Sequence, residues 1–470
     1  MWSRRRFLKI ILAMGMSFSA HSGFGANEPS HRINQSSDSA APTARLPIKR
    51  AATVYRAING TPDQNIVKVV EMMGGIEKLI GLDDIVLIKP NVQWWNQGAP
   101  NLAALKTFVD LVIERPGGFR GEVVLAENCH RGPSPWTSVG SGWAHGFDRN
   151  SDVPGINHVS DLCNVLKNKY GMKFSIRHLI DIAAGNKRIY GPSDGCGYVY
   201  CDGSNGVPLI RCENGAGGAG RRATIMTYPI IRTDRGTVID FKNGIWEKGS
   251  YTGQPVRLIN FSGLNHHSTY CGMTSAIKNY MGIADLSGGP DPMNGGRLSE
   301  DYFNFHSFPF DEWGPGPKSG MLGAEIAVFM KSIRKADLNI TTAEWVGLAS
   351  RTEPPVAHTR AVMACTDPVA LDYHAAKYFL YPNSGVPLHN PDDNKGPLRE
   401  YLQKCAEHGG GILDEGHVAV KSYDFRKRMF QDDADLVVVG ERQWGSDPKS
   451  LLKFMLLRYG AWLLGHIPMY

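Results

Sequence analysis

Polar side chains that can carry chemistry follow four apolar runs of the sequence, each at the point where the run ends. They are Lys89 and Asn91, Glu127 and Asn128, Asn265 with His266 and His267, and Thr366 with Asp367. Open parallel sheets bind their ligands at the carboxyl ends of their strands. We therefore expect these groups to share one edge of a sheet.

Lysine, histidine and glutamate exchange protons in many enzymes, and a few placed polar groups orient bound ligands. Lys89, His266 and Glu127 are accordingly candidate catalytic residues. The further groups expected to bind substrate at this edge are Asn91, Asn128 and Asp367. Two plainer interpretations stay open, because Asp367 stands before Pro368 as in an ordinary helix N-cap, and Lys89 could simply reach solvent.

The segment LNHHSTYCGMTSAIKNYMG, residues 264–282, supplies further polar groups. At 100° per residue its apolar side chains fall on one arc of a short helix, which predicts a core face. Thr274, Ser275, Lys278 and Asn279 fall on the other arc. Because this helix would begin just past a strand end, its N–H groups and Lys278 would favour a carboxylate or phosphate. Lys278 is thus a catalytic candidate, with Thr274 and Asn279 as substrate-binding residues; the alternative is a solvated face.

The adjacent His266 and His267 raise the question of a metal, because imidazole is the commonest metal-ligand side chain. His267 is the candidate ligand, with Glu127 or Asp367 as the carboxylate that completes a hard or borderline site. A divalent metal is the cofactor that such a pair would hold, and its identity stays open. The alternative is that one histidine hydrogen-bonds the loop backbone while the other is exposed.

Tryptophans stand beside the same edge, in the loops NVQWWNQG and SPWTSVGSGWAHGF. The indole rings of Trp94 and Trp95, with Trp136 and Trp143, would form the floor of a pocket for a sugar or an aromatic ligand. Equally, they would cover the end of the sheet as packing.

Three of the eight cysteines, Cys196, Cys201 and Cys212, lie close together in the sequence. In an oxidising compartment two of them would form a disulfide and leave one over. Their spacing, C-x4-C-x10-C, matches no standard zinc or iron–sulfur motif. No iron–sulfur cluster is therefore expected.

The elements that must position these residues alternate between apolar runs and helical patterns. The predicted strands and helices, in order, are ATVYRAI, TPDQNIVKVVEMM, DIVLIKP, LAALKTFVDLVIE, GEVVLAEN, NHVSDLCNVLKNKYG, PVRLINF, ADLNITT, RAVMACT, DPVALDYHAAKYF and ADLVVVGE. Strand, helix and strand in alternation is typical of parallel α/β architecture. The expected fold class is α/β, with a mostly parallel sheet flanked by helices.

The pattern fails between Ile180 and Pro255, where glycine, asparagine and short β-like runs dominate. We expect a glycine-rich β insert at about 180–255. Its GAGGAG run, Gly215–Gly220, has the letters of a dinucleotide motif, but a strand-like sequence follows it where that motif requires a helix. A glycine-rich hairpin or loop is the favoured interpretation.

The N-terminal residues read SRRRFLK and are followed by an apolar stretch and then by small residues. The twin-arginine export pattern is matched at each fixed position, by Ser3, Arg4, Arg5, Phe7, Leu8 and Lys9. We expect a signal peptide over 1–26, a flexible linker over 27–48 and the α/β domain over 49–470. The twin-arginine export machinery is then a partner, and the periplasm or cell envelope is the destination. The alternative is an ordinary secretory peptide.

Charge and hydropathy exclude two classes of protein. The formal charge is +6, and four basic residues leave with the signal, so the mature chain carries +2. No dense basic run remains, and nucleic-acid binding is not expected. No later stretch has the roughly 18 uninterrupted apolar residues that span a bilayer, so no transmembrane helix is expected in the mature chain.

Three segments resemble a known family. VLIKPNV, TSAIKNYMG and DPVALDYHAAKYF look like the recurrent segments of the uncharacterised domain-of-unknown-function family 362 (DUF362), in the same order and spread over residues 84–380. That family commonly shows a Lys-x-His pair shortly before the second segment. This chain has Leu264-Asn265-His266 there, so no role is carried over for that lysine. Some relatives carry ferredoxin-like cysteine clusters, which this sequence lacks. The resemblance implies an architecture and a site but no reaction.

Two functions stay open from the sequence. The first is an exported enzyme that acts on an anionic small molecule at the C-terminal edge of the sheet, with lysine or histidine as acid or base and a metal as a further option. The second is a non-catalytic envelope protein that binds a glycan or similar ligand through the tryptophan loops. A stoichiometric metal or organic cofactor in the purified protein would favour the enzyme.

Overall fold

The computed structural model describes residues 51–128, 141–179, 188–201, 203, 205–208, 210–211, 223–268, 270–285, 297–299, 302–303, 319–431 and 433–460. These residues belong to a unit that runs from Ile48 to Tyr470. The expected signal peptide and linker lie outside the described residues, so their boundaries stay predictions.

The first part of this unit alternates strands and helices as the sequence predicts. Its elements are β1 (Ala52–Ile58), α2 (Pro62–Met72), α3 (Ile76–Leu79), β2 (Ile85–Pro90), α4 (Leu102–Ile113), β3 (Glu122–Glu127), α5 (Val159–Tyr170) and β4 (Phe174–His178). Local capping begins two of the helices. The Thr61 N–H donates to Gln64 Oε1 at 3.0 Å, and Asn101 Oδ1 accepts from the Ala104 N–H at 3.0 Å.

One large sheet joins these strands to later ones. The later strands are β13 (Val256–His266), β14 (Met273–Thr274), β17 (Leu338–Gly347), β18 (Val356–Cys365), β19 (Val418–Asp424), β20 (Met429–Gln431) and β21 (Glu441–Gln443). The strand order is β20-β19-β1-β18-β17-β13-β2-β3-β4, with β14 on β13 and β21 on β18. Strands β17, β13, β2, β3 and β4 are parallel, whereas β18 is antiparallel to both β17 and β1. The expected α/β class with a mostly parallel sheet is confirmed.

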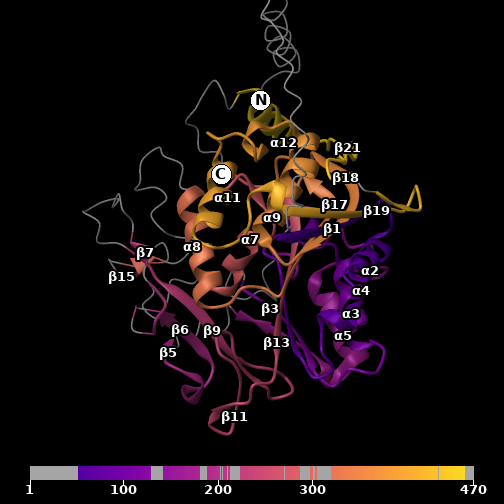
Figure 1. Cartoon of the computed structure of the whole chain (residues 1–470). Helices are drawn as coiled ribbons and strands as arrows, with labels where there is room; N and C mark the ends of the chain where they lie inside the picture. The colour runs from indigo at the N-terminus through magenta and orange to yellow at the C-terminus, as the bar shows by residue number, and fades with distance from the viewer. Residues whose placement is uncertain are drawn as a thin grey trace, which may run out of the picture. The chain divides into compact units, whose positions relative to one another are not determined.

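Helices cover both faces of this sheet (Figure 1). Alternate residues of β2 belong to two separate cores: Val86 and Ile88 pack with α2, α4 and α5, whereas Leu87 packs on the other side. The helices of that second side are α8 (Ser319–Ser332), α9 (Pro368–Ala375) and α11 (Pro397–Glu407). Because both faces are covered, the central strands read as continuous apolar runs, and a polar residue inside them must find a buried partner.

Shorter helical segments lie between these strands and helices and after them. They are η2 (Asn96–Gly98), η3 (Gly171–Lys173), η4 (Pro192–Asp194), α7 (Ala276–Asn279), η5 (Tyr280–Ile283), η7 (Ala376–Leu380), α10 (Tyr381–Ser384), η8 (Pro387–His389), η9 (Glu415–His417), α12 (Pro448–Met455) and η10 (Leu456–Gly460). No helix among the described residues is both long enough and apolar enough to cross a bilayer.

Strand β18 is antiparallel to β17 and β1, so Asp367 does not follow the carboxyl end of a parallel strand as the sequence predicts. Cys365, the last residue of β18, pairs with Asn339, near the beginning of β17. Asn339 is level with Asn260 and with Lys89, so Asp367 follows beside the beginning of β17, two residues past the level of Lys89. There its Oδ1 caps α9 by accepting from the N–H groups of Val369 at 3.0 Å and Ala370 at 2.9 Å. The N-cap interpretation of Asp367 is confirmed, and its expected contact with substrate stays a prediction.

The prediction of a last strand at ADLVVVGE is wrong. Residues 433–440 have no strand structure, and β21 begins only at Glu441. Val437 and Val439 are exposed, so the apolar run does not enter the core as a strand would. Single hydrogen bonds replace strand pairing here. The Val438 N–H donates to the Tyr378 carbonyl oxygen at 2.9 Å, and Asn383 Nδ2 donates to the Val438 carbonyl oxygen at 2.8 Å.

A second sheet of six strands occupies the stretch where an insert is expected. Its order is β12 (Ser250–Tyr251), β11 (Gly244–Glu247), β10 (Val238–Asp240), β9 (Met226–Arg232), β6 (Gly197–Cys201) and β5 (Arg188–Ile189). A third sheet pairs the short strands β15 (Arg297–Ser299), β16 (Tyr302–Phe303), β8 (Ala223–Thr224) and β7 (Ile210–Arg211). The glycine run at 215–220 lies outside the described residues, so a glycine-rich insert stays a prediction.

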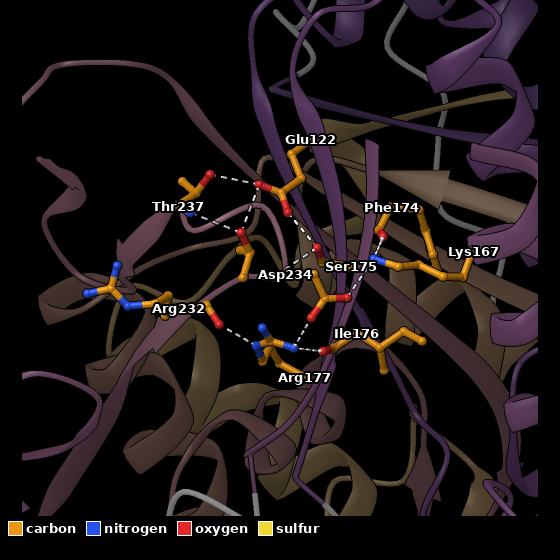
Figure 2. A network of polar contacts seen from close by, with 10 residues as sticks. Glu122, Lys167, Phe174, Ser175, Ile176, Arg177, Arg232, Asp234 and Thr237 are labelled. Atoms are coloured by element: carbon orange, nitrogen blue, oxygen red, sulfur yellow. Dashed lines mark hydrogen bonds and ion pairs between the residues drawn. The ribbon is translucent and has the colours of Figure 1, made fainter. Parts of the chain in front are cut away.

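A polar network joins the second sheet to the first (Figure 2). The buried carboxylate of Glu122 on β3 accepts from the hydroxyls of Ser175 at 2.5 Å, Thr233 at 3.0 Å and Thr237 at 2.8 Å. Beside it, Asp234 lies 2.7 Å from Arg177 and 2.6 Å from Lys167. Every group here has a partner within the protein, which identifies the network as structural.

Candidate functional site

Residues 270–285 form the centre of the candidate site, but not as the two-faced helix that the sequence predicts. Strand β14 turns back against the end of β13, α7 is one turn long, and η5 follows it. Every residue of the segment is buried except Lys278, which keeps part of its surface. The polar arc is therefore not a solvated face, because Thr274, Ser275 and Asn279 lie inside the protein.

The N-terminus of α7 already holds an anion from the protein itself. The N–H groups of Ala276 and Ile277 donate to the two carboxylate oxygens of Asp372, at 2.8 and 2.9 Å. Burial raises the pKa of Asp372 to about 7, and these two bonds oppose the rise. The expectation that these N–H groups bind an external carboxylate or phosphate is wrong, since Asp372 occupies them.

Lys89 and Glu127 form a buried ion pair where β2 and β3 end. Lys89 Nζ lies 2.5 Å from a carboxylate oxygen of Glu127, and the two side chains are 3% and 2% exposed. Nζ also donates to the Pro90 carbonyl oxygen at 2.9 Å and to Asn279 Oδ1. Burial raises the pKa of Glu127 to about 7, and the positive charge of Lys89 opposes that rise. Three of the predicted site residues thus meet here.

A band of buried amides continues from this pair across the sheet. Asn279 Nδ2 donates to the Lys89 carbonyl oxygen at 2.9 Å and to Asn260 Oδ1 at 2.7 Å. Asn260 Nδ2 in turn donates to Asn339 Oδ1 at 2.8 Å. Asn260 and Asn339 each stand inside an apolar run of the sequence, PVRLINF and ADLNITT. A buried amide requires hydrogen-bond partners, so an asparagine in such a run indicates a buried polar contact.

Gly282 and Asn128 close the segment over the ion pair. A Cβ on Gly282 would clash with Lys89 Nζ and would lie 2.9 Å from Glu127 Oε1, so only glycine allows this approach. The Asn128 N–H donates to the Gly282 carbonyl oxygen at 2.8 Å, and its side chain donates to the Ala284 carbonyl oxygen. Asn128 therefore fixes the segment, and Asn91 is half-buried just after β2.

Lys278 belongs to a second group of residues. Its other two members are cations that no pattern in the sequence indicates. We call Lys278, Arg351 and Lys453 the cation group. Burial lowers the pKa of Lys278 to about 8, Cys271 opposes the shift, and the charges of Arg351 and Lys89 add to it. Burial and the charge of Arg351 also lower the pKa of Lys453 on α12. Within the described part of the chain, no hydrogen bond or ion pair engages the Lys278 ammonium.

Cys271 supplies no counter-charge to Lys278 at neutral pH. Burial raises the pKa of its thiol to about 12, and the Cys271 Sγ–H donates to the Met273 carbonyl oxygen at 3.0 Å. The thiol is therefore neutral. The charges of the cation group repel one another without compensation from this residue.

Arg351 links the cation group to the end of β13. Its Nη2 lies 2.9 Å from His267 Nε2, and its guanidinium lies 5.2 Å from the centre of the Trp94 ring. A positive group at this distance disfavours a metal ion on His267 Nε2. The described residues contain no cluster of three or more His, Cys, Asp or Glu that could hold a metal.

His266 and His267 lie farther along the sheet than Lys89 does. Lys89 is level with Asn260 in the pairing of β2 with β13, and β13 continues six residues to His266. Six residues of strand span about 20 Å. The single edge that the sequence predicts is therefore two levels, the ion pair of Lys89 inside and the histidines outside.

The tryptophans pack against the protein rather than forming one floor. Trp95 stacks on His145 with ring centres 3.7 Å apart, and its centre lies 5.9 Å from that of Trp94. Trp143 is fully buried and meets His178 edge-on at 4.3 Å. Trp136 lies outside the described residues.

The expected disulfide is not formed between Cys196 and Cys201. Cys196 is a free thiol, so it bridges neither neighbour. Cys212 lies outside the described residues.

The two levels of the site offer different chemistry. Lys278, with a pKa of about 8, is partly neutral near neutral pH and can hold or release a proton. Arg351 presents a planar guanidinium that suits carboxylate or phosphate. The Lys89–Glu127 pair, by contrast, is closed in by Asn279 and Gly282 and holds the sheet end together.

Comparison with known protein families identifies part of the chain. Residues 254–377 match the family described as Domain of unknown function (DUF362). The matched stretch contains β13, α7, β17, β18 and α9, and with them His266, Lys278 and Arg351. The resemblance predicted from the sequence is confirmed for this stretch. No curated protein and no solved structure matches the chain.

Proposed function

We propose that this protein binds an anionic small molecule at the cation group and acts on it by proton transfer through Lys278. One observation carries the proposal: Lys278 is the accessible residue of an otherwise buried segment, and it lies among further cations. Like charges are held together at a cost unless an anion of the ligand compensates them. A carboxylate or a phosphate is the group that fits.

Each cation has a distinct role in this proposal. Arg351 holds the anion through its fork of N–H donors, and Lys453 adds charge from α12. Lys278 exchanges a proton with the bound molecule, because both of its protonation states are populated near neutral pH. Thr274 and Asn91 stay predicted substrate contacts. The glycan-binding alternative has less support, since Trp94 and Trp95 already pack on Arg351 and His145.

Titration calorimetry with inorganic phosphate and with acetate tests the anion site. Lys278→Met should lower the affinity for at least one of them roughly tenfold or more, the usual effect of losing a hydrogen bond to a charged group. Lys106→Met is the matched control, because it removes the same charge from a surface ion pair with Asp110. Equal losses in both variants, or no binding by the wild type, would contradict the proposal.

A separate measurement tests whether the protein is an enzyme. A panel of carboxylates and phosphate esters is incubated with the wild-type protein and with Lys278→Met, and consumption is followed by mass spectrometry. We expect one class of compound to be consumed by the wild type alone. Binding without consumption of any compound would support a non-catalytic binding protein instead.

The site is proposed to work in the periplasm or cell envelope. The support is the pattern of Ser3, Arg4, Arg5, Phe7, Leu8 and Lys9 in the sequence. Arg4→Lys combined with Arg5→Lys should leave the precursor uncleaved and folded inside the cell, as cell fractionation and immunoblotting would show. Normal processing of this double variant would refute the twin-arginine route.

A further inference from the structure

Helix α12 and the helical segment η10 after it carry apolar side chains on two opposite faces. On the inner face, Phe454 and Leu457 are buried in the core of the protein. The outer face has four apolar side chains that are between 38% and 59% exposed, which we call the outer stripe: Leu452, Met455, Leu456 and Tyr459. The first three have the i, i+3, i+4 spacing that places side chains on one face of a helix. The inner face thus explains how the segment is held, but not why its outer face is apolar.

The outer stripe belongs to a local concentration of exposed apolar side chains. Trp444, just after β21, is exposed, and its ring meets Phe454 edge-on with ring centres 5.7 Å apart. Five of the thirteen large apolar side chains that are exposed in the described part of the chain lie within residues 444–459. Single exposed apolar residues are ordinary, whereas a cluster of them marks a surface that contacts another body.

The segment that carries the outer stripe is positively charged. Residues 448–470 include Lys449, Lys453 and Arg458 but no aspartate or glutamate. Lys449 is exposed and Arg458 is half-buried, whereas Lys453 belongs to the cation group. The acid just before the helix, Asp447, accepts from the backbone N–H of Lys449 as the N-cap. The segment therefore suits a partner that is both apolar and negatively charged.

Three occupants are able to cover an apolar stripe of this kind. Residues 461–470 contain no acidic residue, so they offer no counter-charge to Lys449 and Arg458. A second copy of the chain, related by a two-fold axis, would bring the same cations against one another. The surface of a bilayer that contains anionic lipids supplies an apolar layer and negative charge together. The charge of the segment therefore favours the bilayer.

We propose that α12 and η10 dock this protein on the surface of a bilayer that contains anionic lipids. The outer stripe enters the boundary between headgroups and acyl chains, while Lys449 and Arg458 stay at the lipid phosphates. Trp444 lies at the same boundary, which suits an indole ring because one end of it is apolar and the other polar. The helix rests on the membrane without crossing it, since its eight residues are far short of the roughly 20 that span a bilayer.

Co-sedimentation of the mature, full-length protein with lipid vesicles tests the docking. One set of vesicles contains phosphatidylglycerol and phosphatidylcholine in equal parts, and the other contains phosphatidylcholine alone. We expect binding to the anionic vesicles, weakened at 1 M salt, where the Debye length falls to about 3 Å. Binding to phosphatidylcholine alone should be at least about tenfold weaker, since each cation near an anionic surface contributes roughly fivefold. Absence of binding to the anionic vesicles would overturn the proposal.

Substitutions in the outer stripe test whether this surface makes the contact. Met455→Gln combined with Leu456→Gln should weaken binding to the anionic vesicles about tenfold or more, because two apolar side chains no longer enter the lipid. Met429→Gln combined with Phe430→Gln is the matched control, since these two residues of β20 are also adjacent and exposed. Circular dichroism should show that both double variants fold as the wild type does. Equal losses of binding in the two would contradict docking through α12.

A single substitution tests the role of charge. Lys449→Gln should weaken binding to the anionic vesicles roughly fivefold and leave the weak binding to phosphatidylcholine unchanged. Lys173→Gln is its control, because Lys173 is likewise exposed but lies in η3. The same loss in both variants would mean that only the net charge of the protein matters.

Size-exclusion chromatography with light scattering separates the bilayer from the other occupants. We expect the wild-type protein to be a monomer in the absence of lipid. A dimer that dissociates on Met455→Gln with Leu456→Gln would show that a second copy covers the stripe, and would overturn the proposal. A monomer that binds no vesicles would leave residues 461–470 as the cover, with the same consequence.

Discussion

Replacing Glu127 by leucine is expected to lower the free energy of unfolding by about 3–5 kcal/mol, because it leaves the ammonium of Lys89 buried without its carboxylate. Lys89 would keep the Pro90 carbonyl oxygen and Asn279 Oδ1 as acceptors, but neither carries a charge. Urea denaturation followed by circular dichroism measures the change. A loss below about 1 kcal/mol would show that the pair is not isolated from water, since exposed ion pairs are worth only that much.

The double variant Glu127→Leu with Lys89→Met is the control for this prediction. Replacing both partners by apolar side chains of similar size is commonly neutral or stabilising, so most of the lost stability should return. The double variant also separates stability from function. If it folds as well as the wild type and binds phosphate equally, the ion pair is structural. If it folds but does not bind, Lys89 or Glu127 belongs to the site as the sequence predicts.

The alternation of strands and helices can be predicted from the sequence because its causes are local. Thr61 and Pro62 begin α2, Asn101 begins α4, and each apolar run between them is as long as the strand it forms. The direction of β18 is not local, since RAVMACT has the same pattern in a parallel or an antiparallel strand. Strand β18 is antiparallel to both β17 and β1, so Asp367 does not follow the carboxyl end of a parallel strand as predicted.

The sequence predicts a site residue correctly when the predicted strand before it ends at the right position. It misses a site residue when the strand is longer than predicted. Lys89 and Glu127 end two adjacent parallel strands, so they meet. Arg351 escapes the same argument because the predicted strand ADLNITT stops at Thr342, whereas β17 continues to Gly347. Lys453 is brought in from α12, more than 170 residues after Lys278, and no local pattern records such a contact.

Helical periodicity also fails at residues 273–281 for a physical reason. The pattern distinguishes polar from apolar side chains, but it does not show whether a polar side chain meets water or another buried group. Ser275 Oγ lies 3.0 Å from Thr341 Oγ1, and Asn279 bonds Lys89 and Asn260. These buried partners replace solvent, so the polar arc lies inside the molecule. Only Lys278 behaves as the pattern predicts.

Phosphate affinity should be lost as the pH rises above about 8, while the stability contributed at Lys278 should increase over the same range. Burial and neighbouring charges lower the pKa of Lys278 from 10.5 to about 8. The protonated form binds an anion, so the affinity falls as the pH rises through about 8, by up to tenfold per unit, until it reaches the affinity of Lys278→Met. Calorimetric titration at pH 7, 8, 9 and 10 measures this loss.

The sign for stability is opposite because the unfolded chain keeps the proton longer. Between pH 8 and 10.5 the unfolded state binds more protons at Lys278 than the folded state, so stability rises with pH there, by an amount on the order of 2–3 kcal/mol. Lys278→Met has no such group, so it should be the more stable protein at pH 7, and the difference should close by pH 10.5. Parallel stability curves for the two proteins would mean that the ammonium of Lys278 is hydrated, and would leave the cation group without the strain that an anion is proposed to relieve.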